Sequence, residues 1–207
     1  MIVAEHSSAA VRTALDALRP LRSAEQEVRK VPRVLAEAGV RYALVESLPG
    51  AKIDGACFWL NERSPVIGMT LRYDRIDNFW FVLRHELEHV ARRHGTDAAM
   101  LDAELEGARA GVDGVAEEER LANAAASEFC VPRRDMDEFV ARKSPYFAER
   151  DIVSFARTIG VHPGLVAGQL QHITKRYDRF RDHQVKVRSH IAPSAMVDGW
   201  GDVAPVD

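Results

Sequence analysis

Most of this chain carries a helical pattern of apolar and polar positions. Apolar residues recur at spacings of three and four through residues 9–19 and 24–38, which predicts helices near the N-terminus. Pro32 lies inside the second pattern and fits the first turn of a helix, so the second helix is expected to be interrupted or to restart there. The N-terminal region is therefore predicted to be helical.

Three segments that follow have the composition of β-strands. Residues 41–46, 56–60 and 66–71 are short and rich in residues that favour strands, and turn residues at 49–50 and 61–64 separate them. We therefore predict an α+β fold, in which a small three-stranded, mainly antiparallel sheet packs on the helix that comes next in the chain.

That next segment combines an apolar run with a motif of ionisable residues. The stretch Phe79–Leu83 is apolar, and His85-Glu86-Leu87-Glu88-His89 follows it closely. Either Asp74 or Asp77 can cap the start of a helix here, and Gly95 can end it. The positions expected to face the core are Phe79, Leu83, Leu87 and Val90. The pattern predicts a helix whose histidines lie off this apolar stripe.

The motif has the form HExxH. At 3.6 residues per turn, His85 and His89 lie on one helix face, so both imidazoles can bind a single metal ion. Zinc accepts imidazole nitrogens, and a catalytic zinc ion has three protein ligands and one position for water. Glu86 is placed beside the metal, where it can act as a general base. The alternative is a pair of surface histidines on an amphipathic helix.

A second predicted helix can supply the third ligand. Residues 117–129 are rich in helix formers and begin with acidic residues, which the helix dipole favours at this end. Glu119 and Asn123 are four residues apart and share a face, so Glu119 can bind the metal while Asn123 orients a ligating histidine. Glu117 and Glu118 are interpreted only as an acidic helix start.

Several segments of the chain together resemble a known family. They are 55–60, 65–68, 72–80, the motif segment 81–89, 119–123, Val131-Pro132 and 162–171. Between about residues 31 and 188 the chain resembles the ImmA/IrrE family of zinc metallopeptidase domains, and more closely the peptidase-like C-terminal half of HigA-type antitoxin regulators. The resemblance implies that His85, His89 and Glu119 bind Zn²⁺ and that Glu86 is the catalytic base.

The motif and the resemblance lead to the hypothesis of a zinc-dependent endopeptidase. The resemblance implies a helix-turn-helix repressor or related regulator as the protein substrate, cleaved in a stress response or during induction of a mobile element. The alternative is a non-cleaving zinc-binding module of an antitoxin-like regulator, of the kind found in toxin-antitoxin systems. Glu86 favours the peptidase, because a structural zinc site does not need a general base. A DNA-binding regulator is the least favoured class.

Composition and charge agree with this hypothesis. The 207 residues are 46% hydrophobic, enough for one domain with a sizeable core, and the net charge of −3 gives no overall basic field for nucleic acid. The apolar stretches are shorter than a membrane span and the N-terminus lacks a signal-peptide pattern, so we expect a cytoplasmic protein. Cys57 and Cys130 are expected to be buried thiols.

Other polar residues are weaker candidates for chemistry. His162 precedes Pro163, so its plain role is a turn or helix cap; its catalytic alternative is to stabilise a developing oxyanion, for which Tyr73 is weaker still. His94 is expected at the surface. A basic cluster is interpreted as a solvated helix face, with a partner- or phosphate-binding patch as the alternative. Its members are Lys175, Arg176, Arg179, Arg181, Lys186 and Arg188.

The remaining segments complete the predicted organisation. Residues 95–116 are expected to form a loop with at most a short ordered piece at 99–101. Further helices are predicted at 133–142, 150–159, 163–172 and 175–181. The expected parts are an N-terminal helical extension (1–30), the metallopeptidase domain (31–190) and a flexible tail (191–207). The extension is too short for a compact DNA reader, so either the chain is a fragment or a partner supplies DNA binding.

Overall fold

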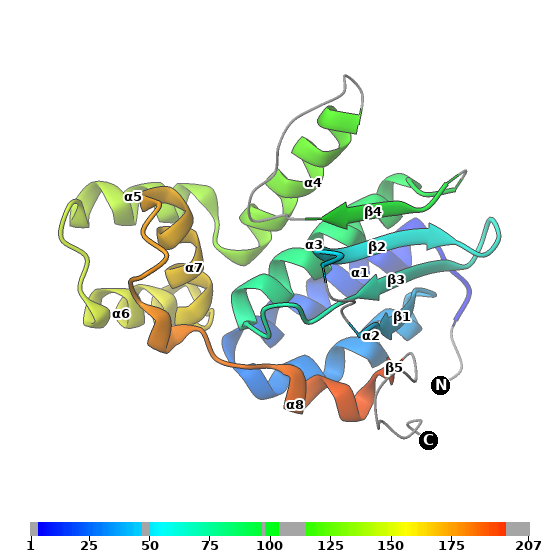
Figure 1. The fold of residues 1–207 in the computed structure, drawn as a ribbon, viewed down its shortest axis with the longest axis horizontal. Coiled ribbons are helices and arrows are strands. Elements are labelled where there is room, and N and C mark those ends of the chain that lie inside the picture. The colour runs from blue at the N-terminus through cyan, green and yellow to red at the C-terminus, as the bar shows by residue number, and fades with distance from the viewer. Residues whose placement is uncertain (1–3, 47–49, 97, 104–114, 198–207) are drawn as a thin grey trace.

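The computed structural model of the chain describes residues 4–46, 50–96, 98–103 and 115–197, and it has an α+β fold (Figure 1). The α-helices are α1 (Ser8–Leu18), α2 (Val31–Glu37), α3 (Ile76–Arg92), α4 (Val115–Cys130), α5 (Arg133–Lys143), α6 (Glu149–Ile159), α7 (Pro163–Thr174) and α8 (Arg188–Ile191). Short 3-10 helices are η1 (Arg19–Ser23), η2 (Glu25–Lys30), η4 (Arg181–His183) and η5 (Ala192–Ser194). The strands are β1 (Arg41–Leu44), β2 (Ile53–Trp59), β3 (Pro65–Met69), β4 (Met100–Ala103) and β5 (Met196–Val197). The predicted α+β class is confirmed.

The sheet is mixed and larger than predicted. Its strand order is β4-β2-β3-β1-β5, with β2 antiparallel to β3 and β4, and β1 parallel to β3 and β5. The three predicted strands are present, but the expectation of a mainly antiparallel three-stranded sheet is wrong in detail. β1 lies beside β3 and not beside its sequence neighbour β2, and this crossover makes β1 and β3 parallel.

β4 comes from the segment that was predicted to be a loop with at most a short ordered piece at 99–101. It pairs with β2, with Met100 opposite Cys57 and Asp102 opposite Gly55. Residues 100–103 contain no β-branched or aromatic residue, so strand propensity did not indicate a strand. Pairing with the open edge of β2 determines this strand, and the rest of the predicted loop from 104 to 114 lies outside the described residues.

The predicted flexible tail is wrong for its first residues. Met196 and Val197 form β5 against β1, and Ile191 and Ala195 are buried. These residues order the chain because they add to the hydrophobic core and to an open sheet edge. Residues 198–207 lie outside the described part of the chain.

The N-terminal region folds as helices that belong to the same core as the sheet. The Ser7 side chain caps α1 by accepting a hydrogen bond from the backbone amide of Ala10, at 3.1 Å. The helix restarts as predicted, with Pro32 in the first turn of α2. Val11 and Leu18 of α1 pack in the same hydrophobic cluster as the central helix α3, so the predicted extension is packed onto the domain.

The start of α3 differs from the prediction. Its N-cap is Arg75, which makes no side-chain cap, and neither Asp74 nor Asp77 takes that role. Asp77 lies in the first turn and accepts a hydrogen bond from Arg75. The Asp74 carboxylate accepts hydrogen bonds from the backbone amides of Val187 and Arg188, at 3.0 and 2.7 Å. Asp74 therefore caps the start of α8, which is far from it in sequence.

Helices α5, α6 and α7 gather at one end of the molecule, and the sheet lies at the other (Figure 1). The helix predicted at 175–181 is absent: α7 ends at Thr174, its C-cap Lys175 has a left-handed backbone (φ 56°), and Arg176 then pairs with Asp178. Within the described residues, no helix is both long enough and apolar enough to cross a membrane.

Candidate metal centre

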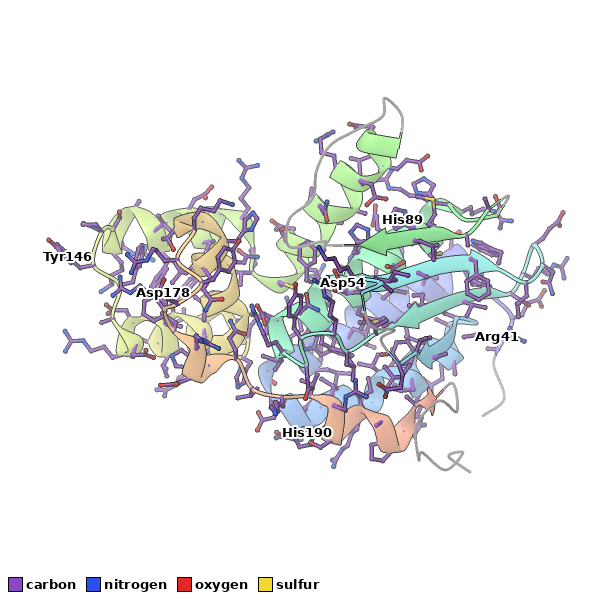
Figure 2. The ribbon with its side chains drawn as sticks, in the orientation of Figure 1. Arg41, Asp54, His89, Tyr146, Asp178 and His190 are labelled. Atoms are coloured by element: carbon purple, nitrogen blue, oxygen red, sulfur yellow. The ribbon has the colours of Figure 1, made fainter. Side chains whose placement is uncertain are left out.

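The histidines of the motif lie on the face of α3 that meets α4, and Figure 2 labels His89 there. The side chains of His85 and His89 are fully buried, and their Nε2 atoms are 3.0 Å apart. The helix brings the rings together as expected, because residues four apart lie on the same face. The alternative of two surface histidines is wrong.

The first turns of α4 add a carboxylate to this pair. Glu119 places Oε2 3.3 Å from His85 Nε2 and Oε1 3.4 Å from His89 Nε2. The three groups could hold a metal ion, since one donor atom from each lies within 4.8 Å of the others. With bonds of about 2.0 to 2.1 Å, donors around one tetrahedral zinc are about 3.3 Å apart. The spacing in this cluster matches that distance.

Asn123 lies behind His85, as the sequence predicted. Its Oδ1 is 3.1 Å from His85 Nδ1, one helical turn beyond Glu119. An amide oxygen only accepts hydrogen bonds, so this contact places the His85 proton on Nδ1 and leaves the Nε2 lone pair directed at Glu119 and His89. The contact therefore selects the form of His85 that can bind a metal.

Glu86 is fully buried and lies against the backbone of β2. A Cβ atom added at Gly55 would lie 2.1 Å from Glu86 Oε1 and 2.9 Å from Val82 Cγ1. No side chain fits at position 55 without moving the carboxylate. The glycine thus gives the candidate base its place between α3 and the sheet.

Glu88, the other glutamate of the motif, has a different environment. Although burial by itself raises its pKa, hydrogen bonds from Arg84 and Arg92 hold the pKa of Glu88 below its ordinary value. Both hydrogen bonds are 2.6 Å long and join residues one turn away on α3. Glu88 is therefore part of an ion-pair network on the helix, which leaves Glu86 as the candidate base.

His162 does not lie with the motif residues. It caps α7, with Nδ1 accepting a hydrogen bond from the Gly164 amide at 3.0 Å, and its Nε2 is 3.7 Å from Glu25. Gly164, which follows in α7, packs on Ile76 at the start of α3. His162 therefore has the role of a helix cap, and its oxyanion role stays a prediction.

Two residues at the site were not predicted to belong to it. His94, expected at the surface, places Nδ1 2.9 Å from His89 Nδ1, and Glu118, expected to be only part of an acidic helix start, places Oε1 3.6 Å from His94 Nε2. Helical spacing could not indicate His94, because α3 ends before it. The available signal was Gly95, which marks a tight turn directly after the helix.

The remaining candidates have structural explanations. Cys57 and Cys130 are buried, as predicted, and burial raises the pKa of the Cys130 thiol to about 12. In the basic cluster, Arg176 pairs with Asp178 and Arg188 pairs with Glu46. These pairs favour a solvated, locally neutralised surface over a phosphate-binding patch. Tyr73 has the guanidinium groups of Arg72 and Arg75 over its ring.

A cavity of about 770 Å³ lies between α3, α4, α5 and α7, next to the centre. Asn123 and Phe81 line this cavity. Asn123 also contacts His85, and the Phe81 ring lies next to the His85 ring, with 6.4 Å between the ring centroids. Farther from the centre, the cavity is lined by Met136, Leu165 and Ile173 among others. The volume is within the range of ligand-binding pockets, about 300 to 1,000 Å³.

Comparison with known proteins gives no match: neither a family model nor a curated protein is similar to this chain at a significant level.

Proposed function

We propose that this protein is a zinc-dependent endopeptidase of the ImmA/IrrE type, which cleaves a helix-turn-helix repressor or a related regulator. One observation carries the proposal: the buried His85 and His89 meet the half-buried Glu119, and the buried Glu86 is their neighbour on α3. Two imidazoles and one carboxylate are a ligand set that catalytic zinc sites use. A buried ionisable cluster is costly to fold, so its presence favours a functional role.

Zinc held by these residues would polarise a peptide carbonyl and lower the pKa of water toward about 7. The Glu86 carboxylate then accepts a proton from the attacking water and returns it to the nitrogen of the leaving amine. Asn123 keeps His85 in the form that binds the metal. Gly55 leaves the Glu86 carboxylate room beside the sheet.

The sheet can also supply the binding surface for an extended peptide. β4 is the edge strand, and Asp102 of β4 pairs with Gly55, which abuts Glu86. A peptide that adds to this edge would be held by backbone hydrogen bonds to β4. Only β4 would then separate it from β2, the strand that abuts Glu86.

The test compares the wild type with Glu86→Gln, each incubated with helix-turn-helix regulators encoded next to the protein. We expect both to bind one zinc ion, by elemental analysis, and only the wild type to cut a regulator. Loss of a general base should slow cleavage by about 10²- to 10⁴-fold. Mass spectrometry of the products would locate the cut.

Glu88→Gln is the matched control, because it makes the same change in the same motif at a residue bound to Arg84 and Arg92. It should retain cleavage. A wild type that binds zinc and leaves every such regulator intact would favour the non-cleaving regulatory module instead.

A further inference from the structure

The Nδ1 side of His89 is closed by a second histidine. The rings of His89 and His94 have centroids 5.2 Å apart and an interplanar angle of 52°, and their Nδ1 atoms are 2.9 Å apart. The His94 side chain is 16% exposed, so this contact is largely shielded from water. The distance is that of a hydrogen bond, which requires one nitrogen to donate and the other to accept.

The end of α3 fixes the position of His94. Arg93 has a left-handed backbone (φ 62°), which turns the chain back so that the His94 amide donates to the His89 carbonyl at 2.9 Å. The His94 carbonyl accepts a hydrogen bond from Trp59 Nε1 of β2 at 2.8 Å. Gly95 packs so closely on β2 that an added Cβ would lie 2.7 Å from the Cys57 carbonyl oxygen. The backbone of His94 is therefore hydrogen-bonded to α3 through its amide and to β2 through its carbonyl.

The direction of the hydrogen bond follows from the role of His89. A neutral imidazole carries one N–H, and the Nε2 of His89 faces His85 and Glu119, where a metal ligand needs a lone pair. The proton of His89 then lies on Nδ1 and is donated to His94 Nδ1. The proton of His94 consequently lies on Nε2, which faces Glu118 Oε1 at 3.6 Å.

We propose that His94, supported by Glu118, is a positioning residue that holds His89 in its metal-binding tautomer and orientation. This inference rests on the proposed metal site. His94 does for His89 what Asn123 does for His85, but with an imidazole and a carboxylate in place of an amide. Two adjacent residues of α4 then have different roles. Glu119 binds the metal, and Glu118 orients His94, which contacts the ligand His89.

The experiment measures zinc affinity by competition with a colorimetric chelator, using the full chain. His94→Leu introduces an apolar side chain of similar size and removes the hydrogen-bond acceptor. It should weaken zinc binding by about 10- to 100-fold. His94→Asn restores an acceptor near the position of Nδ1 and should recover most of that loss. The visible spectrum of the cobalt-substituted protein should change in His94→Leu and return toward the wild type in His94→Asn.

Glu118→Gln should weaken zinc binding less than His94→Leu. Glu117→Gln is its matched control, since Glu117 is next to it in sequence but pairs with Arg120, and it should bind zinc as the wild type does. Wild-type affinity in His94→Leu, or equal losses in the Leu and Asn variants, would overturn the inference. If the wild type binds no zinc, or if His89→Ala binds it equally well, the metal site itself is wrong.

Discussion

The two halves of α3 are buried to a similar degree but are surrounded by different chemistry. From Ile76 to Leu83 the buried side chains include Phe79 and Trp80, whose rings meet edge to face with centroids 5.3 Å apart. From His85 onward the buried side chains include His85, Glu86 and His89. Burial of an apolar ring stabilises the fold directly, whereas burial of an ionisable group costs free energy unless specific partners compensate.

The difference shows which neighbours each half requires. The first half needs only well-packed apolar neighbours, which many side chains of the core provide. The second half depends on individual polar atoms from other parts of the chain: Asn123 and Glu119 from α4, and His94 from the turn after α3. One helix thus carries a stabilising half and a half that fits a chemical role.

The largest expected effect on folding is in the apolar half. Phe79→Ala leaves a cavity beside Trp80 and should lower the free energy of unfolding by about 3 to 5 kcal/mol. The folded fraction should bind zinc as the wild type does, because no polar partner of the centre is removed. Urea denaturation of the metal-free protein and a zinc titration measure the two quantities. A large loss of zinc affinity would erase the distinction between the halves.

In the polar half we expect the reverse. His89→Ala removes a candidate ligand and should weaken zinc binding by at least about 100-fold, or about 2.7 kcal/mol. The stability of the metal-free protein should change little, because the substitution also relieves the crowding of Nε2 lone pairs and a carboxylate. The same denaturation and titration experiments apply. A collapse of metal-free stability would show that His89 is mainly a core residue.

A smaller effect should appear where β2 meets the polar half. Gly55→Ala places a methyl group within contact distance of Glu86 Oε1 and should cost about 1 to 3 kcal/mol of stability through overpacking. Cleavage should fall while zinc is retained, because the base moves and the ligands do not. Gly68→Ala, where the nearest atom to an added Cβ is 3.7 Å away, is the control. Equal cleavage by both variants would contradict the role of Gly55.

The smallest effect concerns His162, outside both halves. Burial lowers the pKa of His162, and His183 also lowers it, whereas Glu25 opposes the shift. The unfolded chain therefore binds a proton at His162 more readily than the folded chain does. The contribution of neutral His162 to the free energy of unfolding is fully present above a pH of about 6.5 and is lost as the pH falls through the lower pKa of the folded state.

His162→Asn keeps an acceptor for the Gly164 amide but does not titrate. Between about pH 8 and about pH 5, the wild type should lose more free energy of unfolding than this variant. Equal losses in denaturant titrations at the two pH values would show that His162 does not contribute.

The sequence by itself determined the features that depend on spacing along one helix. The four-residue spacing of His85 and His89 places both rings on one face of α3, and the spacing of Glu119 and Asn123 does the same on α4. The contact between Asn123 and His85 could be anticipated because a ligating histidine needs an acceptor behind it. Local periodicity fixes such positions before any tertiary contact forms.

Tertiary structure decided what depends on segments that meet only after folding. β4 and β5 are strands because sheet edges pair with them, and Asp74 caps a helix that lies more than a hundred residues later. His94 reaches His89 through a left-handed turn anchored on β2, and Gly55 matters because Glu86 lies against it. These contacts join residues with no common period, so their pairing is set by packing and hydrogen bonding in three dimensions.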